Sequence, residues 1–431
     1  MHMILFKLLK YFFECVHTFR LPAEEVEKRQ IAKFRKVFEL ARKKSPFYRE
    51  LYRKAGVLDL EIRTMDDIRK VPTIDKALLR LHKSEELLTT GSPKGLLTTT
   101  TSGSTGEPVQ LYSSRYEMLT SYVRVFVMYW KCGWRPWHRI LMLNRYRPDS
   151  VFEGEKQLPW LRMVQKAIPL FRRDIVSVFN PPETIGRWIQ ERPDAQVLLS
   201  TPSALDILCS YYEAHDISRP FRLVVLMSET LSDAQRARFK KRFGPNIVGH
   251  YGSQECPTIG FDDGTRDEKR LFSESVLLEL LDTPSGLPRQ KEAVVTNLVQ
   301  HAMPIIRLRT HDLIEDLGAA DCPIKRIGPV CGRMDDILRL PSGRLFFHHQ
   351  AYAMYSSFLD CLQYKFVQYP DGHVALRLHV RDGADKAVVE ADALRRWTDH
   401  YPNEPLAIEF VPLMDVSPKT GKFKNIERLD P

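Results

Sequence analysis

The chain has 431 residues, of which 43% are hydrophobic and 27% charged, the composition of a globular protein long enough for two or three domains. Its seven cysteines are scattered and never spaced as Cys-x-x-Cys, which argues against a disulfide framework or a structural zinc site and indicates a reducing, cytoplasmic location. The net charge is +10, and residues 1–54 contribute most of it, with 14 Lys/Arg against 6 Asp/Glu. Because the remainder is nearly balanced, the basic composition does not indicate a nucleic-acid partner.

Residues 1–17 predict an amphipathic helix. Its apolar residues recur at helical spacing: Ile4, Leu5, Leu8, Leu9, Phe12, Phe13 and Val16. Lys7, Lys10 and Glu14 interrupt the stretch, so it is neither a membrane span nor a secretory signal. Two hypotheses stay open. The favoured one is a helix packed on the protein's own surface, and the other is a peripheral anchor on the inner face of an anionic membrane.

Two further helices are expected, over 24–44 and 116–133. In the first, Ile31, Phe34, Val37, Phe38 and Ala41 share one face, and the cationic end before Pro46 is typical of a helix terminus. The second is rich in aromatic residues, which at this spacing are usually core. Only its last turn and the residues that follow, 129–137, are expected to line a substrate pocket.

Between these helices lies a loop, 98–108, with the sequence TTTTSGSTGEP. Strand-like segments flank it at 96–100 and 108–112. Glycines allow a close backbone approach to a ligand, and successive N–H groups and hydroxyls form a concavity that suits an anion. No Gly-Lys-Ser/Thr triplet follows, so this is not a Walker loop. The pattern therefore predicts phosphate binding rather than a flexible Ser/Thr/Gly linker.

From residue 139 to 249, short apolar strands alternate with helices. The expected strands are 139–143, 196–199, 223–227 and 247–249, and the expected helices are 203–212 and 233–243. This alternation predicts a largely parallel sheet with helices on its faces, in which ligands bind beyond the carboxyl ends of the strands. Ser228-Glu229 and Tyr251 to Glu255 follow two of those ends.

The remaining chain predicts two smaller parts. Strands expected at 276–280, 293–297 and 305–309 indicate a β-rich subdomain, and a cluster of Gly, Pro and charge at 328–336 indicates a domain boundary. The fold class is therefore α/β. A large N-terminal domain, 1–334, combines mixed, largely parallel sheets with flanking helices and the β-rich subdomain, and a small, mobile α+β domain follows at 335–431.

Six segments in one order now suggest a family. They are TTSGSTGEP (100–108), SE (228–229), HYGSQE (250–255), RLRTHDL (307–313), GRMDDIL (332–338) and PKTGKFKNIERL (418–429). In this order the chain resembles the acyl-adenylate-forming superfamily over nearly its whole length. Within that superfamily it is most similar to the phenylacetate–CoA ligase and capsule-biosynthesis adenylate-ligase branch, also through VVTNL at 294–298.

The resemblance implies activation of a small carboxylic acid by ATP and Mg²⁺, with transfer of the acyl group to a thiol. The thiol is expected to belong to coenzyme A or to the phosphopantetheine of an acyl carrier protein; an amine of an envelope sugar is the alternative acceptor. Aryl or arylacetic acids are common substrates in this branch, and a fatty chain also fits. The competing hypothesis is a non-catalytic scaffold of the same fold at a membrane-associated complex.

The resemblance also assigns the site. The phosphate loop residues are Thr101, Ser102, Gly103, Ser104, Thr105 and Gly106, which would bind the β- and γ-phosphates of ATP. The nucleotide segment adds Glu229 near the adenine, Tyr251 stacked on it, and the neighbouring Gly252, Ser253 and Gln254. Glu255 would hold Mg²⁺. Asp312 would accept hydrogen bonds from the ribose, and Arg333 would contact ribose or phosphate.

Lys422 is the residue expected to drive adenylation, since it follows glycine in the Gly-Lys pattern and would bring a point charge to the carboxylate and α-phosphate. Asp335 would be the hinge of the C-terminal domain. Two positions depart from the family. His311 stands where glycine is usual, and Gln254 where threonine is common. Cys256 has no downstream Cys or His partner before His301, so no zinc is expected. The His348-His349 pair is expected to be structural rather than a pair of ligands, because adjacent residues on a strand face opposite ways.

Overall fold

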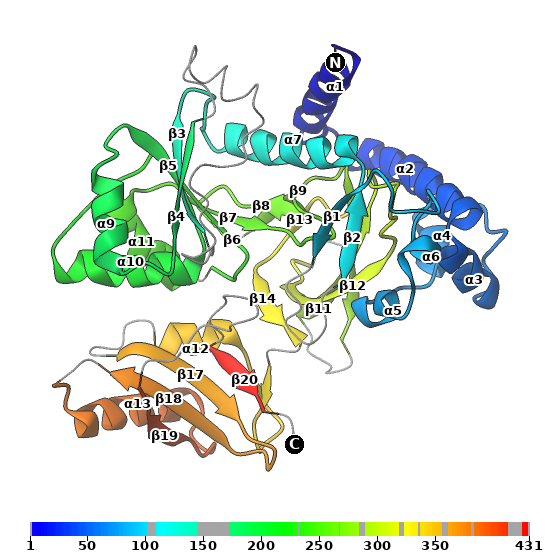
Figure 1. Ribbon diagram of the computed structural model, residues 1–431. Coiled ribbons are helices and arrows are strands. Elements are labelled where there is room, and N and C mark those ends of the chain that lie inside the picture. The colour runs from blue at the N-terminus through cyan, green and yellow to red at the C-terminus, as the bar shows by residue number, and fades with distance from the viewer. Residues whose placement is uncertain are drawn as a thin grey trace. The chain divides into compact units, whose positions relative to one another are not determined.

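The structure is a computed structural model. It describes residues 2–100, 109–144, 172–231, 233–266, 268–283, 289–318, 323–334, 337–355, 361–380, 383–412 and 425–429. The chain divides into two compact units (Figure 1). The first comprises Met1–Glu229, Phe239–Thr310 and Ile314–Pro329, and the second comprises Thr230–Arg238, His311–Leu313 and Val330–Pro431.

Six helices open the first unit. They are α1 (His2–Thr18), α2 (Ala23–Lys44), α3 (Pro46–Lys54), α4 (Met65–Lys70), α5 (Lys76–Arg80) and α6 (Ser84–Leu87). The α2 helix buries the predicted face, including Phe34 and Val37. Ser45 ends α2 and caps α3, where its hydroxyl accepts a hydrogen bond from the Tyr48 N–H. A cap of this kind satisfies one of the free N–H groups that every helix start exposes.

The largest sheet of the first unit has the order β13-β9-β8-β7-β6-β5-β3-β4. Its strands are β3 (Arg139–Asn144), β4 (Arg173–Ser177), β5 (Ala195–Ser200), β6 (Leu223–Met227), β7 (Ile247–Tyr251), β8 (Gly260–Phe261), β9 (Lys269–Leu271) and β13 (Arg326–Ile327). From β4 to β7 every pair is parallel, and β8, β9 and β13 continue antiparallel. The predicted parallel sheet is thereby confirmed.

Helices cover both faces of this sheet. On one side lie α9 (Pro182–Gln190), α10 (Pro202–Ala214) and α11 (Asp233–Phe243), as Figure 1 shows. On the other, α7 (Arg115–Lys131) and α1 share a hydrophobic cluster with alternating sheet residues such as Val197, Leu199 and Val225. Alternating strand residues point to opposite faces, so the near-continuous apolar strands are explained by burial on both sides.

Tyr129 and Trp134 belong to that cluster and are 5% and 2% exposed. The prediction that 129–137 lines a substrate pocket therefore finds no support at these two positions, since core packing explains them. Trp130 and Trp137 are exposed, and Trp130 packs edge-on against Phe12 of α1.

Two smaller sheets complete the first unit. The strands β1 (Leu97–Thr100) and β2 (Gln110–Ser113) pair antiparallel on either side of the predicted phosphate loop. The strands β10 (Val276–Asp282), β11 (Gln290–Asn297) and β12 (Leu308–Glu315) lie side by side. The strand predicted at 305–309 corresponds to β12, which begins later, at Leu308. The reason is that Arg307 has a φ of 49°, which extended backbone does not adopt.

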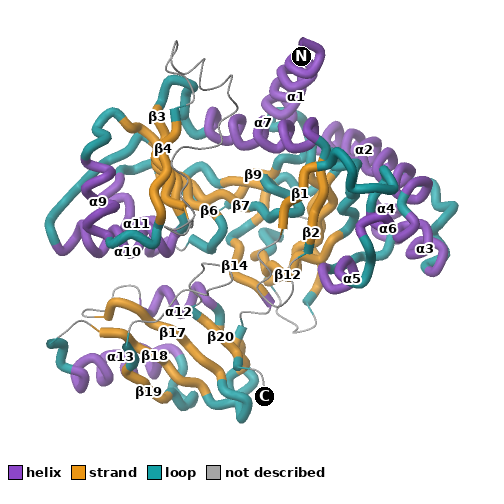
Figure 2. The backbone as a smooth tube through the Cα atoms, viewed as in Figure 1, coloured by secondary structure: helices purple, strands orange, loops and turns teal. Residues whose placement is uncertain are grey.

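The second unit is an α+β arrangement. Next to the His311–Leu313 part of β12 runs β14 (Val330–Arg333), followed by the hairpin of β15 (Leu338–Arg339) and β16 (Leu345–Phe346). A sheet of order β19-β18-β17-β20 follows, formed by β17 (Cys361–Gln368), β18 (Val374–Val380), β19 (Ala407–Phe410) and β20 (Ile426–Arg428). Figure 2 shows these strands with the unit's helices.

The helices α12 (His348–Tyr355) and α13 (Lys386–His400) pack on one face of its sheet. That face presents Phe366, Leu376 and Leu378, and Trp397 of α13 is buried among them. The prediction that His348-His349 lies on a strand is wrong, because the pair opens α12. The Phe347 N–H donates to Gln350 Oε1 at 2.9 Å, a contact that starts the helical turn.

Candidate functional site

The two strand ends that the sequence singled out are neighbours. Strands β6 and β7 are adjacent and parallel, so Ser228-Glu229 and the segment 251–255 leave the same edge of the sheet. Glu229 is held by the start of α10, where the Ser203 N–H donates to Oε2 at 2.9 Å and the Ser203 hydroxyl donates to Oε1 at 3.0 Å. A carboxylate at a helix N-terminus is stabilised by the helix dipole, which fixes Glu229 beside the edge.

Ser228 precedes this carboxylate with a φ of 70°, in the left-handed region. A residue other than glycine in that region is strained, and such strain concentrates at functional sites. The conformation turns the chain sharply after β6 and directs Glu229 toward α10.

The segment 251–255 is a tight turn. A Cβ atom on Gly252 would lie 2.3 Å from the Pro257 carbonyl oxygen, so no larger residue fits. The Ser253 N–H donates to the Cys256 carbonyl at 2.9 Å, and the Cys256 N–H donates back to the Ser253 hydroxyl at 3.2 Å. Tyr251, at the end of β7, is only 7% exposed. The sequence predicts no role for the preceding residue, His250. Burial and the nearby Lys269 lower the pKa of His250 to about 4, so its imidazole is neutral at pH 7.

Glu255 is buried, with 1% of its surface exposed, and its carbonyl accepts a hydrogen bond from Asn297 Nδ2 at 3.0 Å. Lys76 Nζ lies 2.9 Å from Oε1 in an ion pair. The pair lacks hydrogen-bond geometry, and no other described group donates to that oxygen. A buried carboxylate oxygen with spare acceptor capacity is a ligand that Mg²⁺ prefers, since this ion is usually bound by one or two carboxylates together with substrate phosphates. Glu255 therefore fits the expected metal.

Lys76 was not predicted. It stands at the first position of α5, after Asp75, whose carboxylate caps the helix by accepting from the Leu78 N–H at 2.7 Å. The preceding Ile74 exchanges backbone hydrogen bonds with the residues on either side of Leu308 and so anchors the turn. Nothing in the sequence around Lys76 shows which carboxylate the lysine meets.

In the second unit, the structure brings Asp312 and Arg333 together. They lie on the neighbouring strands β12 and β14, with Arg333 Nε 3.7 Å from Asp312 Oδ1. That separation exceeds a hydrogen bond, and both side chains keep some exposure, at 18% and 25%. The expectation that Asp312 accepts from the ribose and that Arg333 contacts ribose or phosphate stays a prediction.

His311, beside Asp312, has a φ of 62°. Its left-handed backbone gives a physical reason for the glycine that the resemblance leads us to expect there, because only glycine adopts this region without steric cost. The substitution in this chain is therefore a strained one.

We expect His311→Gly to raise the free energy of unfolding by roughly 0.5–1 kcal/mol, because it relieves this strain. Urea denaturation measures the change. His311→Ala is the matched control, since it removes the imidazole but keeps the Cβ atom that causes the strain. A gain from alanine equal to that from glycine would show that the imidazole, not the backbone, is unfavourable.

Several predicted site residues lie outside the described residues. They are the phosphate loop residues Thr101, Ser102, Gly103, Ser104, Thr105 and Gly106, together with Asp335 and Lys422. Gln254 is exposed at the turn. In the described part of the chain, no three His, Cys, Asp or Glu side chains gather in a way that could hold a metal ion. The expectation of no zinc stays a prediction.

We compared the chain with known protein families, sequences and solved structures. No family model matches the chain. It is 24% identical over 336 residues to a phenylacetate–coenzyme A ligase of Thermus thermophilus, covering 74% of this chain and 72% of the relative. It is 22% identical over 403 residues to Protein CapK of Staphylococcus aureus, covering 88% and 83%.

Among solved structures, the chain is similar to 2-hydroxyisobutyryl-CoA ligase in the postadenylation state in complex with R3-HIB-AMP. The TM-score is 0.74 at 16% identity, and the match covers 95% of this chain and 90% of that one. This likeness shows a shared fold. In sequence, the chain is similar to phenylacetate–coenzyme A ligases over about three quarters of its length.

Proposed function

We propose that this protein activates a small carboxylic acid with ATP and transfers the acyl group to the thiol of coenzyme A. Similarity to phenylacetate–coenzyme A ligases over about three quarters of the chain carries the proposal. The arrangement of Glu229 and 251–255 on one sheet edge supports it, since nucleotides bind at this edge of parallel sheets.

The reaction has two steps. An oxygen of the substrate carboxylate attacks the α-phosphorus of ATP, the bond to the bridging oxygen breaks, and pyrophosphate leaves. The sulfur of coenzyme A, as the thiolate, then attacks the acyl carbonyl, and AMP leaves with the bonding electrons. Bound Mg²⁺ supplies positive charge that offsets the phosphates. Glu255 would hold it, and Tyr251, Glu229, Asp312 and Arg333 would orient the nucleoside.

Coenzyme A is preferred to a carrier protein because several basic side chains of residues 1–54 already have acidic partners. Lys33 pairs with Glu14 at 2.6 Å, and both Arg42 and Lys43 pair with Glu39, at 2.5 and 3.1 Å. Charges paired in this way steer an acidic partner less effectively than free ones. Similarity to Protein CapK keeps an envelope-sugar amine as a second acceptor to be tested.

Peripheral membrane contact through residues 1–17 is a separate proposal from the reaction, since no residue of that segment belongs to the candidate site. No described helix is long and apolar enough to cross a membrane.

The test is a substrate panel. The purified protein is incubated with ATP, Mg²⁺ and aryl, arylacetic, arylacrylic or fatty acids, and hydroxylamine traps the acyl-adenylate as a hydroxamate. We expect one class of acid to give hydroxamate and pyrophosphate in equal amounts, and none with an ATP analogue whose α,β-bridge is a methylene. Replacing hydroxylamine with coenzyme A, a phosphopantetheinylated carrier or an amino sugar then identifies the acceptor. If no acid gives hydroxamate while the protein still binds ATP, the proposed enzymatic activity is wrong and the scaffold hypothesis is favoured.

A further inference from the structure

The N-terminal helix carries an apolar stripe that faces away from the protein. Leu5, Leu9 and Phe13 are 65%, 53% and 61% exposed, and they follow one another at intervals of four residues along α1. This interval places them in one line on a helix surface. Ile4 and Phe6, at 45% and 69%, extend the exposed apolar surface at the N-terminal end. The prediction that this helix packs on the protein's own surface is therefore wrong at Ile4, Leu5, Leu9 and Phe13. It is confirmed at Phe12 and Val16, which pack against the hydrophobic cluster.

A different face of the same helix is the buried one. Tyr11 and Cys15 are 7% and 0% exposed and join the hydrophobic cluster with residues of α7 such as Val127. Four residues also separate Tyr11 from Cys15, so this second line runs along another side of α1. The helix is therefore apolar on two faces, and the protein covers only one of them.

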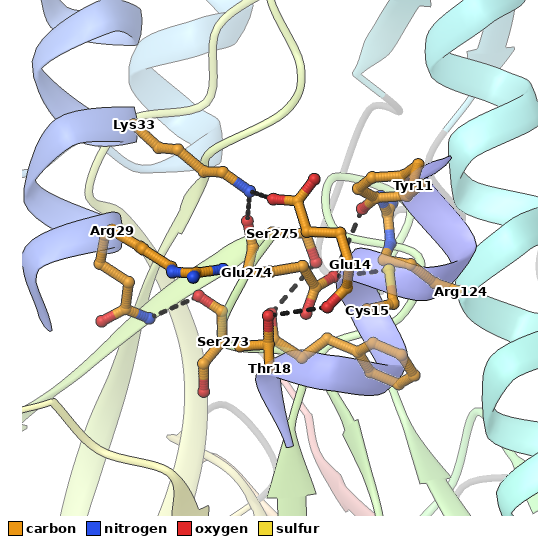
Figure 3. Close-up of polar contacts among 12 residues, drawn as sticks. Tyr11, Glu14, Cys15, Thr18, Arg29, Lys33, Arg124, Ser273, Glu274 and Ser275 are labelled. Atoms are coloured by element: carbon orange, nitrogen blue, oxygen red, sulfur yellow. Dashed lines mark hydrogen bonds and ion pairs between the residues drawn. The ribbon is translucent and has the colours of Figure 1, made fainter. Parts of the chain in front are cut away.

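Polar contacts fix which face is inward (Figure 3). Cys15 Sγ donates to Glu274 Oε1 at 3.2 Å, and the Tyr11 hydroxyl lies 3.4 Å from the same oxygen. Arg124 Nη1 of α7 donates to the Tyr11 hydroxyl at 3.1 Å. Rotating α1 to hide the stripe would leave the buried Glu274 and Arg124 without these partners, and unpaired buried polar groups are costly.

A further contact holds one side of the helix. Glu14 pairs with Lys33 of α2 at 2.6 Å, and Lys33 also donates to the Glu274 carbonyl at 2.7 Å. The C-terminal half of α1 is thus tied to α2, to α7 and to the segment before β10. Its N-terminal turns stand clear of α7 in Figure 1.

We propose that α1 is a rigidly mounted docking helix that binds the surface of an anionic phospholipid membrane. Charge favours this occupant, because Lys7 and Lys10 are exposed on the same helix. Interfacial helices combine such lysines with Leu and Phe that enter the boundary between headgroups and acyl chains. The proposal goes beyond the reaction and does not depend on it.

A second copy of the chain is a weaker candidate for the same surface. Two such helices would bring their lysines together, and like charges oppose association. A stable protein interface also takes about 20 to 30 residues from each partner, whereas α1 exposes five large apolar residues in its described part.

Vesicle flotation tests the proposal with the full-length protein. We expect binding to phosphatidylcholine vesicles that contain phosphatidylglycerol, weakened by salt, and little binding to phosphatidylcholine alone. The variant Leu5→Glu/Leu9→Glu/Phe13→Glu should lose at least about tenfold in vesicle affinity, since it removes inserted apolar groups and adds negative charge. Lys7→Gln/Lys10→Gln should lose about tenfold through charge alone.

Two matched controls accompany these variants. Leu81→Glu/Val388→Glu changes apolar residues that are 80% and 63% exposed elsewhere, and Lys43→Gln/Lys44→Gln removes two exposed lysines at the end of α2. Both should float like the wild type. Equal flotation of the wild type and the stripe variant would overturn the proposal. So would a lipid-free dimer that the stripe variant abolishes, because the stripe would then belong to a second copy. Flotation needs no substrate, so its failure is distinguishable from failure of the proposed reaction.

Discussion

Replacing Glu255 with glutamine is expected to slow acyl-adenylate formation by about 100-fold or more, because a metal ion at the phosphates is worth several kcal/mol of charge stabilisation. Glutamine keeps the shape of the buried side chain but removes the negative charge. The half-saturating Mg²⁺ concentration should therefore rise together with the loss of rate. Pyrophosphate release, followed as a function of Mg²⁺ concentration with the acid identified in the panel, measures both quantities.

The ion pair with Lys76 provides the control. Glu255→Gln also breaks this contact, and its loss alone could disturb the turn at 251–255. Lys76→Met breaks the same pair but leaves the carboxylate in place. If Glu255 binds the metal, Lys76→Met should not raise the half-saturating Mg²⁺ concentration and should lower it, because a competing cation has been removed. The same increase in both variants would show that the ion pair, and not metal binding, accounts for the effect.

Either variant could also act by unfolding the protein, so thermal denaturation accompanies the kinetics. Lys76 is 27% exposed and can turn toward water once Glu255 is neutral. We therefore expect a modest change in stability from Glu255→Gln. A folded variant with wild-type Mg²⁺ dependence would contradict the assigned role.

The local part of the fold was predictable from the sequence. The strand β6 and the helix α11 have the predicted bounds, Leu223–Met227 and Asp233–Phe243, because a short apolar run and a helical run each have a clear local signature. The strand end at Glu229 followed from the same pattern. The positive φ of Arg307 left no local signal, and it moved the start of β12.

Contacts between distant segments were not predictable. Nothing near Lys76 indicates Glu255, because an ion pair joins whichever groups the fold brings together. The helix α1 illustrates a second limit. Periodicity identified a helix with an apolar stripe, but this helix is apolar on two faces, and the partner groups that select the inner one, Glu274 and Arg124, lie far along the chain.

Lys422→Ala is expected to have the largest effect of all on the first half-reaction, a loss of about 1,000-fold. The resemblance assigns its ammonium group to the carboxylate and α-phosphate oxygens, where negative charge rearranges during adenylation, and removing one such preorganised donor costs on the order of 100- to 1,000-fold. The assignment rests on the Gly421-Lys422 pair in the sequence. Because the lysine acts on the transition state, ATP affinity should change little.

The two half-reactions separate this role from a general loss of function. With a supplied acyl-adenylate and coenzyme A, Lys422→Ala should form thioester at close to the wild-type rate, since the adenylation step is bypassed. Lys419→Ala and Lys424→Ala are matched controls, because they remove the same charge within three residues of Lys422. Both should retain adenylation. If Lys419→Ala or Lys424→Ala lost adenylation while Lys422→Ala kept it, the catalytic lysine would be reassigned. If Lys422→Ala lost both half-reactions equally while remaining folded, the lysine would act in binding shared by the two steps and not in the transfer of the adenylyl group.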